Sequence, residues 1–131
     1  MTSLQDRLPG TYRLVSLVTT TTTGDVSRPM GDEPIGMFVF DRAGNYSVHL
    51  TATGTGDRPA MAMFGRYRVD DDAETFVLMP EAATDPGLVG IEVVRHVTFR
   101  DDLGIFETPR FSVDGVEATT VITWRRVAAP S

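Results

Sequence analysis

Gly10-Thr11-Tyr12-Arg13-Leu14-Val15-Ser16 opens a series of about eight short segments of β type, and Thr123-Trp124-Arg125-Arg126-Val127 closes it. Clusters of Gly, Pro, Asp and Asn separate these segments, and hardly any helical period is present. The expected strands are Thr11 to Thr19, Ile35 to Phe40, Tyr46 to Thr51, Met61 to Val69, Thr75 to Met79, Ile91 to Phe99, Leu103 to Thr108 and Val116 to Val127. This pattern predicts an all-β fold, a single antiparallel barrel whose first and last strands meet.

The segments between the strands predict one helical turn and several loops. Ser3 to Leu8 fits a short N-terminal helical turn with Ser3 as its N-cap. Gly44 is available for a positive φ in the hairpin after Phe40. Ala52 to Ala60 is rich in Gly, Thr and Asp and is the best candidate for a mobile loop, and a further loop is expected from Pro80 to Gly90.

Length and composition limit the classes of function. The 131 residues predict one domain, residues 1–131, that is large enough to bury a core. A formal net charge of −6 argues against a nucleic-acid partner and against contact with an anionic membrane surface. The absence of cysteine excludes thiol catalysis, and the N-terminus carries no apolar signal region, so we expect a cytoplasmic protein.

A barrel of this size predicts a cavity for one hydrophobic small molecule. Methionines in the strands offer an adaptable apolar lining. The residues expected to contact a ligand in this cavity are Met37, Tyr46, Met61, Met63, Met79, Val93 and Glu107. The alternative for each apolar residue is ordinary core packing, because side chains fill many small barrels.

Arg95 is the sharpest single signal for chemistry. Strand alternation places it on one face with Val93, Val97 and Phe99, and an arginine among apolar side chains needs a partner. One interpretation is an anchor for a ligand carboxylate, enolate or carbonyl, or for charge that develops during a reaction. The other interpretation is a structural ion pair with Glu107 on the adjacent strand.

Two tyrosines are candidates for hydrogen bonding to a ligand. Tyr67 shares a face with Met61 and Met63, and Tyr46 shares one with Val48. A phenol in an apolar barrel donates a hydrogen bond to a carbonyl or acts as a weak general acid. The alternative is a core aromatic whose hydroxyl reaches a loop carbonyl at the rim, which we favour for Tyr46.

The histidines do not predict a metal site. His49 and His96 both fall on the less apolar faces of their strands, and no sequence pattern of metal ligands surrounds them. We therefore expect neither a metal nor a cofactor.

One further feature concerns the barrel wall. Ile35 to Phe40 is apolar at every position, so its outer face needs a cover, either the N-terminal turn or a second copy in a homodimer.

Several motifs, taken in order, resemble the lipocalin-like domain family of small bacterial and fungal proteins. They are Gly10-Thr11-Tyr12-Arg13-Leu14-Val15-Ser16, Pro34-Ile35-Gly36-Met37, Asp41-Arg42-Ala43-Gly44-Asn45-Tyr46-Ser47-Val48, Phe64-Gly65-Arg66-Tyr67-Arg68-Val69, Gly90-Ile91-Glu92-Val93-Val94-Arg95 and Thr123-Trp124-Arg125-Arg126-Val127. The resemblance covers nearly the whole chain and implies a barrel with an apolar interior. It also implies that Tyr12 packs at the closed end under Arg125 or Arg126.

The resemblance does not imply one activity, because one fold hosts many functions, but some lipocalin-like barrels in natural-product pathways act as cyclases. Our first hypothesis is a cofactor-free cyclase or isomerase of a polyketide-like, carbonyl-bearing substrate, with Arg95 and Tyr67 as catalytic residues that polarise an oxygen. The alternative is a binding or carrier protein for a hydrophobic ligand. A third hypothesis is a structural protein whose barrel is packed solid.

Overall fold

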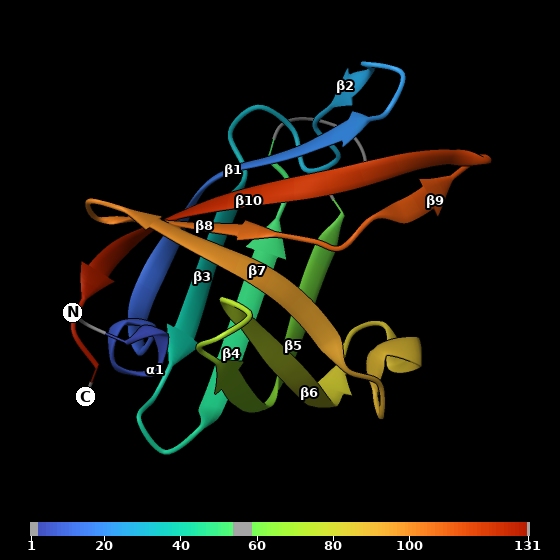
Figure 1. The fold of residues 1–131 in the computed structure, drawn as a ribbon. Coiled ribbons are helices and arrows are strands. Elements are labelled where there is room, and N and C mark those ends of the chain that lie inside the picture. The colour runs from blue at the N-terminus through green and yellow to red at the C-terminus, as the bar shows by residue number, and fades with distance from the viewer. Residues whose placement is uncertain (1–2, 54–58, 131) are drawn as a thin grey trace.

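The strands that the structure describes all belong to one antiparallel sheet (Figure 1). The computed structural model describes residues 3–53 and 59–130, so most of the loop expected at Ala52 to Ala60 lies outside the described residues. The elements are α1 (Leu4–Arg7), β1 (Gly10–Thr21), β2 (Val26–Ser27), β3 (Ile35–Phe40), β4 (Asn45–Thr51), β5 (Ala60–Asp70), β6 (Thr75–Ala83), the 3-10 turn η1 (Pro86–Leu88), β7 (Val93–Arg100), β8 (Leu103–Glu107), β9 (Phe111–Val113) and β10 (Val116–Ala128). No helix within the described ranges has the length and apolar character needed to cross a membrane.

The sheet closes on itself through its first and last long strands. β1 pairs with β3 in its first half and with β10 along nearly its whole length, from Thr11 opposite Ala128 to Thr21 opposite Ala118. The closed order is β1-β3-β4-β5-β6-β7-β8-β10, and the short strands β2 and β9 extend the sheet at one end of the barrel. The predicted eight-stranded antiparallel barrel is confirmed.

A β-bulge makes β6 longer than the sequence predicts. The pairing register of β5 and β6 shifts between Phe64 and Gly65, and Pro80 lies opposite Gly65. A Cβ atom at position 65 would collide with the carbonyl oxygen of Met79, so only glycine permits this close approach. The strand therefore continues past Pro80 to Ala83, and the loop expected from Pro80 begins later.

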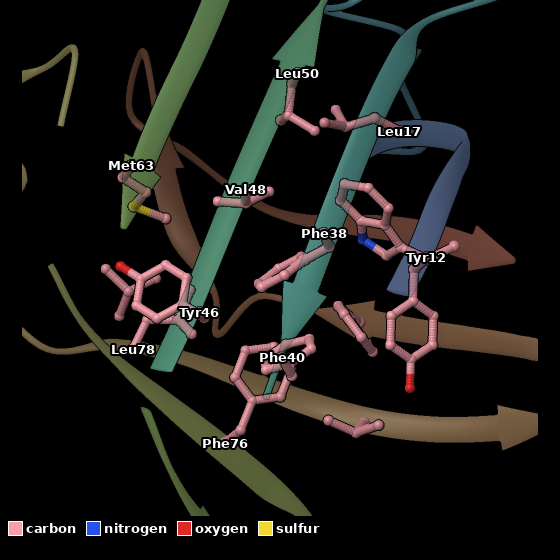
Figure 2. Packing of buried hydrophobic residues seen from close by; sticks show 14 of the residues in the cluster. Tyr12, Leu17, Phe38, Phe40, Tyr46, Val48, Leu50, Met63, Phe76 and Leu78 are labelled. Atoms are coloured by element: carbon pink, nitrogen blue, oxygen red, sulfur yellow. The ribbon is translucent and has the colours of Figure 1, made fainter. Parts of the chain in front are cut away.

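Aromatic rings fill one half of the barrel (Figure 2). Phe38 and Phe40 stack with their ring centroids 4.2 Å apart, and both rings meet Phe76 and Phe106 edge to face. Trp124, only 1% exposed, packs against Phe38 at 5.3 Å between centroids. Such edge-to-face pairs add stability beyond the area that they bury, so this half is a packed core.

The helical turn α1 and the last strand close this end of the barrel. Ser3 caps α1 by accepting a hydrogen bond from the amide of Asp6, as predicted. The Tyr12 hydroxyl donates to the carbonyl oxygen of Leu8 at 2.7 Å, and burial raises the pKa of Tyr12 to about 12. Arg126 lies over the Tyr12 ring at 5.9 Å and donates to the carbonyl oxygens of Arg7 and Pro9. The expected cap is present, and Arg126 forms it.

The outer face of β3 stays uncovered among the described residues. Ile35 is 59% exposed, and Phe64 on β5, two strands along the sheet, is 53% exposed. The prediction that the N-terminal turn covers β3 is wrong, because α1 lies at the closed end, where the amide of Leu4 donates to Asp71. The homodimer remains a prediction.

Two buried tyrosines give a matched test of the core. We expect Tyr12→Phe to lower the free energy of unfolding by about 1–2 kcal/mol, because the buried carbonyl of Leu8 loses its donor. Tyr46→Phe also removes a buried hydroxyl oxygen, but this hydroxyl has no partner among the described residues. The free energy of unfolding therefore stays equal or rises. Urea denaturation followed by circular dichroism measures both, and equal losses would contradict the assignment of the cap.

Light scattering after size exclusion tests the homodimer. We expect a mass of twice 14.3 kDa for the native chain and a monomer for Phe64→Asp, which places a charge on the exposed apolar face. A monomeric mass for the native chain at high concentration would rule the dimer out.

Candidate functional site

The barrel is hollow at the end opposite α1. A pocket of about 580 Å³ opens there, within the range of small-molecule sites. We call it the mouth pocket. Its inner walls are formed by side chains of β1, β4, β5, β7 and β10, namely Leu17, Leu50, Met61, Val93, Arg95, Thr120 and Ile122. Its rim includes Leu88, Ile91 and residues 108–111.

A second, much smaller space lies deeper in the barrel. This inner cavity of about 30 Å³ shares Leu50, Met61, Arg95 and Ile122 with the mouth pocket. Its other lining residues are Phe38, Val48, Met63, Leu78, Phe106 and Trp124. The interior is therefore packed at the closed end and open at the mouth, and Arg95 lies where the two spaces meet.

The strand pairing explains why Arg95 faces inward. It lies opposite Phe76, and its neighbour Val93 lies opposite Leu78. Both partners on β6 are buried, so the alternation of β7 places Arg95 on the inner face, as the sequence predicts. Its Nη1 donates to the carbonyl oxygen of Val94 at 2.8 Å, and burial lowers the pKa of the Arg95 guanidinium.

The predicted ion pair between Arg95 and Glu107 is wrong. Glu107 lies opposite His96, and both side chains are exposed on the outer face of the barrel. Glu107 therefore does not face the cavity, and the prediction that it contacts a ligand there is wrong. Within residues 3–53 and 59–130, no salt bridge involves Arg95.

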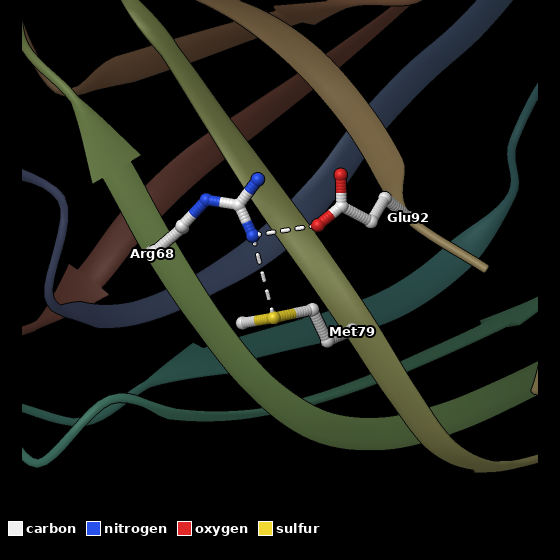
Figure 3. Close-up of polar contacts among 3 residues, drawn as sticks. All are labelled: Arg68, Met79 and Glu92. Atoms are coloured by element: carbon white, nitrogen blue, oxygen red, sulfur yellow. Dashed lines mark hydrogen bonds and ion pairs between the residues drawn. The ribbon is translucent and has the colours of Figure 1, made fainter. Parts of the chain in front are cut away.

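The carboxylates at the mouth are engaged elsewhere. Glu92 accepts a hydrogen bond of 2.8 Å from Arg68 across the outside of β6 (Figure 3). This bond and the charge of Arg68 lower the pKa of the Glu92 carboxyl. At the other side of the mouth, Arg110 and Glu117 form an ion pair at 3.0 Å. Arg95 is thus the charged group that points into the pocket without a carboxylate partner in the described part of the chain.

Two of the methionines predicted to line the cavity lie outside it. Met79 is opposite Arg66, and its Sδ lies 3.5 Å from Nη1 of Arg68 on the outer surface (Figure 3). Met37 is opposite the exposed His49, while its neighbour Phe38 is buried in the core. The predictions for Met37 and Met79 are wrong, because both faces of their strands carry apolar side chains and alternation does not identify the inner face.

Tyr67 does not join Arg95 in one cavity. Its ring packs edge to face on Phe40, and its hydroxyl donates to the carbonyl oxygen of Asp41 in a turn at the closed end. It borders a polar surface groove of about 430 Å³ next to α1 instead of the mouth pocket or the inner cavity. The expectation that Arg95 and Tyr67 polarise the same oxygen is therefore wrong.

Tyr46 is a core aromatic, as favoured, but its hydroxyl does not reach a loop carbonyl among the described residues. It lines neither the mouth pocket nor the inner cavity, so the prediction that it contacts a ligand there is wrong. Only 3% of it is exposed, and its hydroxyl has no hydrogen-bond partner among the described residues. Burial and, to a lesser extent, the nearby charge of Glu81 raise the pKa of Tyr46 to about 12. The tyrosine with a loop carbonyl as its acceptor is Tyr67, not Tyr46.

The remaining predicted ligand contacts point into the barrel. Met61 and Val93 line the mouth pocket, and Met63 lines the inner cavity. The predicted ligand contacts did not include Trp124 and Ile122, which share the inner face of β10. Alternation along β10 carries this signal, because Ile122 and Trp124 follow Ala118 and Thr120 at every second position and therefore share their face.

The histidines lie away from both spaces. His49 and His96 are exposed on the outer face, as their strand faces predict. In the described ranges, no group of three or more His, Asp or Glu side chains could hold a metal ion.

Comparison with known proteins agrees with this architecture. A family model described as a lipocalin-like domain matches residues 9–60 and 56–127. No curated protein matches the chain. No solved structure matches it either. The matched segments span nearly all of the barrel, and the chain therefore belongs to the lipocalin-like domain family.

Proposed function

We propose that the barrel binds one apolar small molecule in the mouth pocket and holds a hydrogen-bond acceptor of that molecule at Arg95. The observation that carries this proposal is the position of Arg95. Its guanidinium lies at the floor of an otherwise largely apolar pocket, and no carboxylate of the described residues pairs with it. A charge in such a place costs stability unless a partner compensates it.

The walls of the mouth pocket favour an apolar ligand. Leu17, Leu50, Met61 and Ile122 surround the space in front of Arg95. Leucine and isoleucine give a fixed surface, whereas the flexible thioether of Met61 adapts to ligands of irregular shape. The polar side chain of Thr120 at the same wall is already engaged with Thr19 at 2.7 Å between the two hydroxyl oxygens.

Arg95 retains the capacity to bind an acceptor. A guanidinium has five N–H donors, and the bond to the Val94 carbonyl uses one of them. A hydrogen bond from a charged donor is roughly twice as strong as a neutral one, and a partly buried site strengthens it. A carbonyl or carboxylate oxygen fits this donor set.

The finer proposal is catalysis. A cofactor-free cyclase or isomerase would fold a polyketide-like substrate within the apolar walls, while Arg95 stabilises negative charge that develops on a carbonyl oxygen. The alternative is a carrier that releases its ligand unchanged. Incubation of the protein with a bound carbonyl compound, followed by mass spectrometry and chromatography, distinguishes them. An isomerase yields a product of equal mass and different retention at a rate that Arg95→Met lowers, whereas a carrier returns the starting compound.

A substitution at Arg95 separates a binding role from a structural role. We expect Arg95→Met to leave the free energy of unfolding unchanged or to raise it by about 0.5–2 kcal/mol, because it replaces a partly buried charge with an apolar side chain of similar length. Urea denaturation measures this change. A loss of several kcal/mol would show that Arg95 stabilises the barrel and would contradict the proposal.

An apolar anionic dye tests the location of the site. We expect anilinonaphthalene sulfonate to bind the native protein, and amide shifts in two-dimensional NMR to concentrate at Met61, Val93, Arg95 and Ile122. The closed-end turn at Ala43 and Gly44 serves as the internal control and should not shift. Absence of binding, or shifts confined to the outer face near Phe64, would contradict the proposed site.

A further inference from the structure

Trp124, which lines the inner cavity, carries a second hydrogen-bond donor. Its indole Nε1 is buried and has no hydrogen-bond partner among the described residues. The side chain is 1% exposed and lines the inner cavity together with Arg95. An indole nitrogen donates and never accepts, and buried indoles usually find an acceptor. The cavity beside Trp124 is therefore a place where a polar acceptor atom gains a hydrogen bond.

The inner cavity has room for such an acceptor. Its volume of about 30 Å³ exceeds the ~10–15 Å³ that one water needs. Its other walls are apolar side chains of Phe38, Val48, Met63 and Leu78. Only Arg95 and Trp124 among its lining residues carry side-chain N–H donors, so an acceptor in this cavity lies beside both residues.

We infer that the ligand is an apolar monocarboxylate that enters head first, with its carboxylate in the inner cavity between Arg95 and Trp124 and its apolar chain in the mouth pocket. This inference rests on the proposed function and specifies its ligand class. A single bound water satisfies the indole but leaves the charge of Arg95 without a counterion. A carboxylate supplies two acceptor oxygens and one negative charge, which match the two donors and the one positive charge.

The apolar tail follows from the shape of the two spaces. Leu50, Met61 and Ile122 line both the inner cavity and the mouth pocket, so the two are continuous. The larger space is the outer one, and its side walls are mainly aliphatic. A ligand with its carboxylate innermost buries its chain against these walls, whereas the reverse orientation buries Arg95 against hydrocarbon.

Trp124 also makes the inference measurable, because it is the only tryptophan of the chain. The test is a competition experiment, in which dodecanoic acid or dodecanol is added to the native protein with anilinonaphthalene sulfonate bound, and displacement of the dye is measured. We expect the acid to bind about tenfold or more tightly than the alcohol, because only the acid brings a charge to Arg95. We expect Arg95→Met to abolish this preference while it keeps binding of the alcohol. Arg100→Met is the matched control, because Arg100 lies on the same strand but is exposed and lines neither space, and it should keep the preference.

The orientation is tested with two brominated acids that differ only in the place of the bromine. We expect α-bromododecanoic acid, with bromine beside the carboxylate, to quench the fluorescence of Trp124. The ω-bromo acid, with bromine at the end of the chain, should quench it much less. Stronger quenching by the ω-bromo acid would overturn the head-first orientation.

The other outcomes separate this inference from the proposed function. Equal affinity for acid and alcohol, or failure of both to displace the dye, would overturn the monocarboxylate class while dye binding at the mouth still supports a ligand site. Failure of the dye itself to bind would contradict the proposed function. A preference that Arg95→Met retains, or that Arg100→Met removes as well, would overturn the role of Arg95.

Discussion

The pairing of β1 with β10 is the constraint on which the rest of the structure depends. It closes the sheet along nearly the whole of both strands, so the barrel has an inside and an outside. Because side chains alternate along every strand, closure fixes which half of them meets in the interior. Tyr12, Leu14 and Leu17 on β1 and Trp124 and Ile122 on β10 are placed inside by this one pairing.

The two ends of the barrel differ in how their arginines are held, and we propose that only the open end binds a ligand. At the closed end, Arg126 is positioned by two backbone carbonyls and the face of Tyr12, so its charge serves the fold. At the open end, Arg95 bonds only the carbonyl of Val94 among the described residues, and the space in front of it is hollow. The two arginines, at opposite ends of one barrel, thus differ in whether the described part of the chain supplies their partners. Sites that lack such partners are where function departs from optimal stability.

The sequence predicts the barrel and the inward position of Arg95 because turn residues and strand alternation are local signals. The bulge opposite Gly65 is not predictable in this way, since it depends on how closely β5 approaches the carbonyl of Met79. Alternation also fails wherever both faces are apolar, as at Met37 and Met79. Glu107 shares a strand face with Leu103 and Ile105, whose apolar side chains suggest the interior, but this face is the outer one, so the predicted inward position of Glu107 is wrong. The exchange between Tyr46 and Tyr67 depends on where the Asp41 turn places its carbonyl, which only the three-dimensional structure shows.

The most direct test of this account is the position of a heavy atom bound inside the barrel. Crystals of the protein grown with α-bromododecanoic acid give the bromine position by anomalous diffraction. The account predicts a bromine in contact with Trp124 and Arg95, with the carbon chain extending through the mouth pocket. A bromine on the outer face beside Phe64 or in the groove beside Tyr67, with side chains filling the mouth, would contradict it.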